Sequence, residues 1–220
     1  MRDPIRSKRL LSMNGLPTEV FLLLFFVGAL AASGCATHSR PITVRMTEHT
    51  PPSESSGLSS IPPITVRVLP FHDRRSQPEG GAITAAFGMP MGHVRFEQSP
   101  AYLLGRAVIS ELKAAGHTVI EAPNGTQITG TVMQFEVSSD TTLLYWDITG
   151  NMAVSLQILP SRERGSGETI EYRARCADRT YVYPSESIIA GVMRECINDF
   201  GSKFRNDERV ARLLRRGPTN

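Results

Sequence analysis

The chain has 220 residues, of which 40% are hydrophobic and 20% charged, so it suits one folded domain with extra segments and excludes wholesale disorder. Its formal charge is +3, but four of its 24 basic residues and two of its 21 acidic residues precede position 35. The remaining 20 basic and 19 acidic residues give a net charge of +1. Phosphate binding needs a surplus of Lys and Arg, so this balance argues against nucleic acid as the main partner.

Residues 1–34 have the pattern of a bacterial secretion signal. Basic residues precede a run of thirteen uncharged residues, 20–32, which is shorter than the roughly 20 residues that a membrane-spanning helix needs. Small residues then lead to the cysteine in Ala31-Ala32-Ser33-Gly34-Cys35. This end resembles a bacterial lipoprotein signal, in which the cysteine receives a diacylglycerol and becomes the new N-terminus. The alternatives are an ordinary signal peptide and an uncleaved anchor.

The lipoprotein pattern implies a location as well as an anchor. Ala36 follows the cysteine, and such lipoproteins are sent to the outer membrane, whereas an aspartate there retains them at the inner one. Residues 35–63 hold the lipidated cysteine and then a Pro- and Ser-rich stretch, with five serines between 53 and 60. Such segments extend by about 3 Å per residue, so we expect a tether between the membrane and a periplasmic domain.

A single domain is predicted from residue 64 to residue 205. Residues 64–68 alternate apolar and polar side chains, as in a strand with one buried face. Ser99 and Pro100 begin a helix that ends at Gly116. Two more strands are predicted at 117–121 and 127–137, and the second contains a bulge near Val132, where its alternation changes phase.

The clearest strand signal runs from 146 to 158, because each even position is apolar or glycine. A polar hairpin loop at 162–167 leads to a returning strand at 170–176, and Ser185 caps a final helix that ends at 204. The order β-α-β-β-β-β-α predicts an α+β fold, a two-layer sandwich of a mainly antiparallel sheet of four to five strands with two helices on one face. Residues 206–220 form a basic tail, either a short amphipathic helix or a frayed end.

These features together resemble the YajG-type family of uncharacterised bacterial lipoproteins. The shared motifs are Gly34-Cys35, the strand 64–69 before Asp73-Arg74-Arg75, the helix ending at 112–117, the long antiparallel strand pair and Tyr181-Val182-Tyr183. The resemblance covers the signal and most of residues 64–214, and it implies an envelope lipoprotein of unknown activity. More distantly, the layout is similar to that of small lipoproteins that accompany envelope lipid transporters.

The cysteines and histidines carry little recognisable chemistry. If Cys35 is lipidated, Cys176 and Cys196 remain as an even pair in an oxidising compartment. Both lie on predicted apolar faces that meet in the core, so a disulfide and two buried free thiols are both open. The five histidines show no ligand spacing, and none follows His117 to activate a cysteine. We therefore expect no metal, no other cofactor and no catalytic residue.

Two loops carry the candidate contact residues. Asp73, Arg74 and Arg75 follow the first strand, where we expect the carboxylate to accept loop N–H groups and the arginines to pair with carboxylates. Phe87, Met89 and Met91 lie in a glycine-rich stretch that lacks the Gly-Lys-Ser/Thr ending of a phosphate-binding loop. Exposed flexible apolar residues suit contact with a protein or a lipid, and packing under the sheet edge is the alternative.

The sequence also shows no nucleophile elbow and no recognisable carboxylate pair, so we expect no enzyme. Our first hypothesis is a lipid-anchored, non-enzymatic binding or assembly module on the periplasmic side of the outer membrane. Its partners would be the membrane and an envelope protein. The alternative is a periplasmic domain that holds a small lipid or glycan in the crevice between helices and sheet, accessory to envelope transport.

Overall fold

The structure is a computed structural model that describes residues 40–52, 56–122, 125–160 and 167–216. These residues belong to one compact unit that spans residues 39–220. The signal peptide, Cys35 and the first residues of the tether lie outside the described residues, as does most of the polar loop at 162–167.

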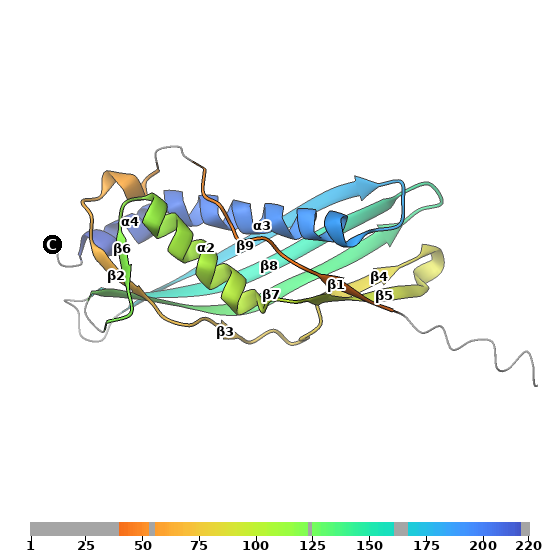
Figure 1. Ribbon diagram of the computed structural model, residues 1–220, viewed down its shortest axis with the longest axis horizontal. Coiled ribbons are helices and arrows are strands. Elements are labelled where there is room, and N and C mark those ends of the chain that lie inside the picture. The colour runs from red at the N-terminus through yellow and green to blue at the C-terminus, as the bar shows by residue number, and fades with distance from the viewer. Residues whose placement is uncertain (1–39, 53–55, 123–124, 161–166, 217–220) are drawn as a thin grey trace, which may run out of the picture. The chain divides into compact units, whose positions relative to one another are not determined.

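The described residues form one mixed β-sheet of nine strands (Figure 1). Its centre is β7, Thr126–Thr141, followed on one side by the antiparallel strands β8, Trp146–Leu159, and β9, Glu168–Thr180. Three short strands run parallel to β7 along its other side: β2 at Thr65–Val68, β3 at His72–Asp73 and β4 at Gly81–Thr84.

Three more short strands complete the sheet. β5, Pro90–Phe96, is antiparallel to β4, whereas β1, Arg40–Val44, is parallel to β5, and β6, Thr118–Ile120, is parallel to β2. The prediction of a mainly antiparallel sheet of four to five strands is therefore wrong. The additional strands have two to seven residues, and they join the sheet through backbone hydrogen bonds that leave no long alternating pattern in the sequence.

The predicted first helix is confirmed as α2, Pro100–Ala114. The Ser99 hydroxyl accepts the N–H of Tyr102 at 3.2 Å, which satisfies one of the free donors at the helix start. Gly116, at φ +89°, lies just past the helix in the left-handed conformation that glycine adopts readily. The second helix, α3, spans Glu186–Asn206, and Asp207 then caps a short helix, α4, at Glu208–Arg215.

The helices bury one face of the long strands. α3 contacts β8 and β9, while α2 contacts β7, β2 and α3. The apolar even positions of β8 are buried and the positions between them are largely not, as their alternation predicts. The predicted bulge in β7 is confirmed by a register shift between Val132 and Gln134. A disulfide joins Cys176 of β9 to Cys196 of α3, with their Cα atoms 5.6 Å apart.

Part of the Pro- and Ser-rich stretch also packs into this core. β1 lies within it, and Val44, Met46, Leu58 and Ile61 are buried. Ile42, Val44 and Met46 alternate with polar residues, as in a strand with one buried face, but this signal is only three apolar residues long and lies in a Pro- and Ser-rich stretch.

Candidate functional site

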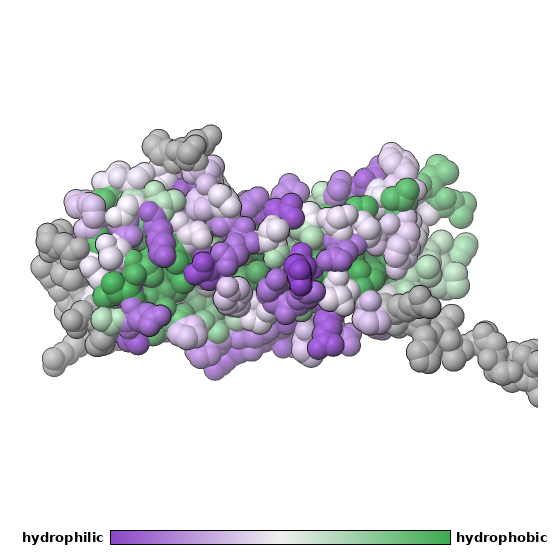
Figure 2. Space-filling model, in the orientation of Figure 1, coloured by the Kyte–Doolittle hydropathy of each residue, from purple (hydrophilic) through white to green (hydrophobic). Residues whose placement is uncertain are grey.

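Large exposed apolar side chains gather at one end of the sheet, which we call the apolar end (Figure 2). It consists of the β4–β5 turn, the β7–β8 turn and the connection from β9 to α3, all of which lie at the right of Figure 1. Its members are Phe87, Met89, Met91, Leu143, Leu144, Tyr181, Val182 and Tyr183. Phe87 is 96% exposed and Leu143 89%. Single exposed apolar residues are ordinary, but a group of them marks an interaction surface.

Hydrogen bonds and aromatic contacts hold the three segments beside one another. The Thr141 hydroxyl donates to the backbone oxygen of Thr84 at 2.6 Å, which joins the end of β7 to the end of β4. The rings of Tyr145 and Tyr181 meet edge-on with centroids 6.4 Å apart. Trp146, at the start of β8, makes a similar contact with a second tyrosine of the β9–α3 connection at 5.7 Å. The apolar end is therefore one surface.

We call Phe87, Leu143 and Leu144, the most exposed side chains of the two turns, the tips. Both turns have defined backbone conformations at these residues. In the β7–β8 turn, the Thr142 hydroxyl accepts the N–H groups of Leu144 and Tyr145 at 3.2 and 3.1 Å. In the β4–β5 turn, Phe87 has φ +63°, a left-handed conformation that is uncommon for residues other than glycine. It is the only such non-glycine residue in the described ranges. A strained residue with a fully exposed ring is typical of a functional position.

Charged groups stand just behind the tips. Arg179 of β9 pairs with Asp147 of β8 at 2.7 Å, and its guanidinium lies 3.8 Å from the centre of the Tyr145 ring. The hydrogen bond from Arg179 holds the pKa of the Asp147 carboxyl below its usual value. This pair keeps charge close to the apolar end without placing an unpaired carboxylate among the tips.

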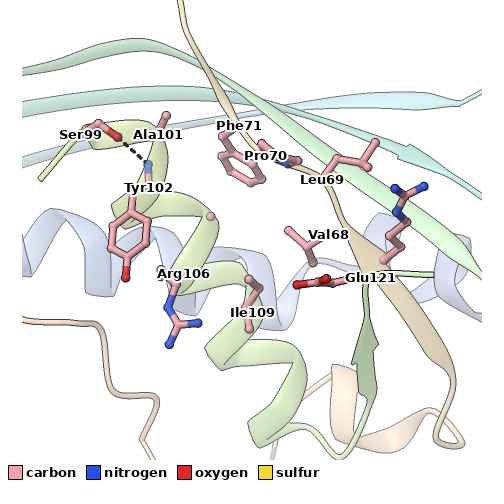
Figure 3. A pocket seen from close by; sticks show the side chains of 12 residues that line it. Val68, Leu69, Pro70, Phe71, Ser99, Ala101, Tyr102, Arg106, Ile109 and Glu121 are labelled. Carbon is pink, nitrogen blue, oxygen red and sulfur yellow. Dashed lines mark hydrogen bonds between the residues drawn. The ribbon is translucent and has the colours of Figure 1, made fainter. Parts of the chain in front are cut away.

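A groove of about 630 Å³ lies beside α2, between that helix and the segment that follows β2 (Figure 3). Its lining includes Val68, Leu69, Pro70, Phe71 and Ile109. Figure 3 shows the Phe71 ring directed toward α2. The groove is open to solvent and mostly apolar.

The polar side chains of the groove do not converge on its floor. Tyr102 and Arg106 of α2 instead reach Glu48, at 3.2 and 3.1 Å. The hydrogen bond from Arg106 lowers the pKa of the Glu48 carboxyl. Arg67 of β2 and Glu121, just past the end of β6, also belong to the lining. A small-molecule site needs a few polar groups directed at the ligand, and this arrangement supplies few of them.

The Asp73–Arg75 segment is bound to its own loop. The Asp73 carboxylate accepts the Arg75 backbone N–H at 3.2 Å and its Nε at 2.9 Å, which lowers the pKa of the carboxyl. Arg75, with a side chain only 7% exposed, also donates to the backbone oxygens of Pro78 and Phe135. Arg74 is exposed, whereas the Arg75 guanidinium donates its hydrogen bonds to groups of the protein itself.

One buried polar cluster was not predicted from the sequence. The His49 ring is hydrogen-bonded through Nε2 to Glu111 Oε1 at 2.7 Å and through Nδ1 to Asn198 Oδ1 at 2.9 Å. The Arg205 guanidinium lies 3.6 Å from the other carboxylate oxygen of Glu111. The Glu111 and His49 side chains are almost fully buried, so the cluster joins the N-terminal segment to α2 and α3. The available signal was Glu111 itself, a carboxylate inside the apolar stripe of α2.

Two further findings concern the described ranges alone. In them, no three His, Cys, Asp or Glu side chains come close enough to hold a metal ion. None of the helices described is both long and apolar enough to span a bilayer. Cys35, the predicted lipidation site, lies outside these ranges.

No family model and no curated protein matches the chain. Among solved structures, protein XCC0632 of Xanthomonas campestris, from family DUF330, matches 79% of this chain and 95% of its own, with 11% identity and a TM-score of 0.51. The two proteins share a fold.

Two similar structures are lipoproteins by name, GNA1162 of Neisseria meningitidis and a minor lipoprotein of Acinetobacter baumannii. Each is 12% identical with a TM-score of 0.35; they cover 63% and 61% of this chain, and 98% and 89% of their own. Similarity at these levels concerns the fold at most, so function has to be argued from the residues of this chain.

Proposed function

We propose that the protein is a lipid-anchored, non-enzymatic binding module of the bacterial envelope. Cys35 would carry the lipid, and the chain would face the periplasm from the outer membrane, as the residues around the cysteine indicate. The YajG-type assignment belongs to the same proposal, and it rests on the sequence motifs alone.

The observation that carries the proposal is the groove beside α2. It is open, its floor is apolar, and its nearby polar side chains on α2 are engaged by Glu48. Such a surface suits an apolar segment of another protein, because side chains of a helix or strand can fill it without polar groups at its floor. We therefore assign the groove to an envelope protein partner.

In-cell photo-crosslinking tests this assignment. A photoreactive residue at Ile109 faces the groove, whereas one at Gln157 lies exposed on β8 and serves as the control. We expect a reproducible protein adduct from position 109 and none from position 157. Gly105→Trp, which fills the groove, should abolish the adduct, and the matched Gly105→Ala should retain it, because a Cβ there would lie 3.7 Å from Phe71, an ordinary contact.

The alternative function is the holding of a small lipid or glycan in the same groove. Mass spectrometry of the purified protein separates the two, because a bound small molecule lost in Gly105→Trp, with no protein adduct, would favour the alternative. An empty groove with neither product would contradict both.

The anchor is tested separately. Cys35→Ala should move the protein from the membrane fraction to the soluble fraction, since a lipidated cysteine would be its covalent attachment. A variant that stays with the membrane fraction as completely as the parent would remove the lipid anchor from the proposal.

A further inference from the structure

The apolar end lies where the chain enters the domain. β1 is parallel to β5, and Arg40 pairs with Gly92, so the first described residue is placed near the β4–β5 turn (Figure 1). Arg40 follows Cys35 by five positions, and a chain of that length spans at most about 18 Å. A lipid on Cys35 therefore brings the bilayer within reach of the apolar end.

The composition of this end fits the boundary of a bilayer better than a protein pocket. Its outermost side chains are Phe87, Leu143 and Leu144, carried on three separate segments with Val182. The aromatic rings of Tyr145 and Trp146 stand behind them. Apolar tips backed by Tyr and Trp are the arrangement found where protein meets the headgroup region, because these rings have one apolar and one polar side.

The charged residues limit how deeply the tips can enter. Asp140 and Asp147 stand opposite each other on β7 and β8, next to the turn, and Asp147 pairs with Arg179. Asp178 of β9 is exposed beside them. Since these carboxylates must stay hydrated, only the tips can reach the acyl boundary, which implies shallow contact of roughly 5–10 Å.

We infer that the apolar end rests on the same bilayer that carries the lipid on Cys35, with Phe87, Leu143, Leu144 and Val182 in the headgroup–acyl boundary. The inference uses the anchor proposed above but not the partner of the groove. This contact would also fix the distance of the groove from the bilayer. The groove adjoins β7 near Gly130 and the apolar end adjoins Thr141, so the groove is held roughly 35 Å farther along that strand.

The single tryptophan of the chain, Trp146, provides the test. We would reconstitute the full lipidated chain in phospholipid vesicles and measure quenching of its fluorescence by brominated lipids. We expect strong quenching when the bromines lie near the headgroups and weak quenching when they lie near the bilayer centre. The variant Phe87→Ser/Leu143→Ser/Leu144→Ser should lose most of the quenching while the lipid keeps it on the vesicles.

Two controls separate docking from other effects. Met133→Ser replaces an exposed apolar residue of β7 away from this end, and it should quench like the parent. The charged residues placed near this end are Asp140, Asp147, Asp178, Arg179 and Arg40, which give no surplus of basic groups, so quenching should not require anionic lipid or low salt. Equal quenching in the parent and the triple variant would overturn the inference, as would a protein adduct from a photoreactive residue at Leu144.

The Cys35→Ala chain distinguishes failure of the lipid-anchor proposal from failure of the docking inference. Without a lipid it should still bind vesicles weakly, and the triple substitution should reduce that affinity by at least about 100-fold, since three apolar side chains lose their burial. If the Cys35→Ala chain does not bind vesicles while the lipidated chain still floats with them, docking would be overturned and the lipid anchor would be retained. If the triple substitution weakens vesicle binding, and the protein isolated from cells carries no lipid, docking would be supported and the anchor rejected.

Discussion

The Phe71 ring occupies the space in which a side chain at Gly130 would lie. A Cβ at Gly130 of β7 would come within 2.7 Å of three ring carbons of Phe71. On the other side of the ring, a Cβ at Gly105 of α2 would lie at 3.7 Å, which is an ordinary contact. Phe71 is thus fitted against the sheet beneath the groove, and glycine at position 130 makes the fit possible.

Gly130→Ala should therefore destabilise the protein by about 1–3 kcal/mol, because the ring has to move in a packed core. Gly105→Ala is the matched control and should raise stability by up to about 1 kcal/mol, since alanine favours a helix interior. Urea unfolding measures both. Phe71→Leu should recover part of the loss in the Gly130→Ala background, and equal stability of the two alanine variants would contradict the packing described.

The buried cluster of His49, Glu111 and Arg205 should be costly to break. Glu111→Ala leaves a buried guanidinium without its carboxylate, and we expect a loss of about 3–5 kcal/mol. Glu111→Gln keeps an oxygen beside His49 and should lose less. Thermal unfolding measures both variants. The exposed pair of Arg45 and Glu97 is the comparison, and a Glu97→Gln midpoint close to that of the parent is expected.

His117 should make stability depend on pH near neutrality. The ring is buried and its Nδ1 accepts the N–H of Ile64 at 3.4 Å. Burial lowers its pKa below the usual 6.5, so the unfolded chain binds a proton that the folded protein resists. The contribution is complete above pH 6.5 and is lost progressively as the pH falls toward the folded pKa.

His117→Gln should flatten that decline, which unfolding free energies measured between about pH 7.5 and about pH 5 would reveal. His72→Gln, at an exposed position of β3, serves as the control. The same slope in the parent and in His117→Gln would refute the assignment.

The disulfide between Cys176 and Cys196 should contribute about 3 kcal/mol, because it closes a loop of 20 residues and restricts the unfolded chain. Replacing both cysteines by alanine should lower stability by that amount and make unfolding insensitive to reductant. Maleimide labelling of the denatured, unreduced protein should leave both positions unmodified. Labelling of either one would show that the bond does not form in the cell.

The sequence predicted the elements whose side chains repeat over many residues. The helix that begins at Pro100, the β8 strand and the bulge in β7 all follow from such periodicity. β3, β4 and β5 could not be predicted this way, because they are short and backbone pairing holds them. β1 has only the brief alternation of Ile42, Val44 and Met46, inside a Pro- and Ser-rich stretch. Together these strands change the sheet from the expected antiparallel one into a mixed one.

For the candidate surfaces too, residues that lie close together in the sequence could be predicted, whereas residues brought together by folding could not. Phe87, Met89 and Met91 could be singled out because they lie together in one glycine-rich stretch. Leu143 and Leu144 could not, since only the pairing of β7 with β4 brings the two turns together. The groove likewise combines α2 with a segment some thirty residues earlier, a juxtaposition that depends on tertiary packing.

The parallel pairing of β1 with β5 also determines how the domain would respond to tension. The anchor would pull on Arg40, at the outer end of β1, while a partner held in the groove would pull from farther along the sheet. A force along β1 acts in shear on the five residue pairs that run from Arg40–Gly92 to Val44–Phe96, so their hydrogen bonds share the load instead of opening one after another. With the proposed anchor on Cys35, β1 would therefore resist extraction from the sheet.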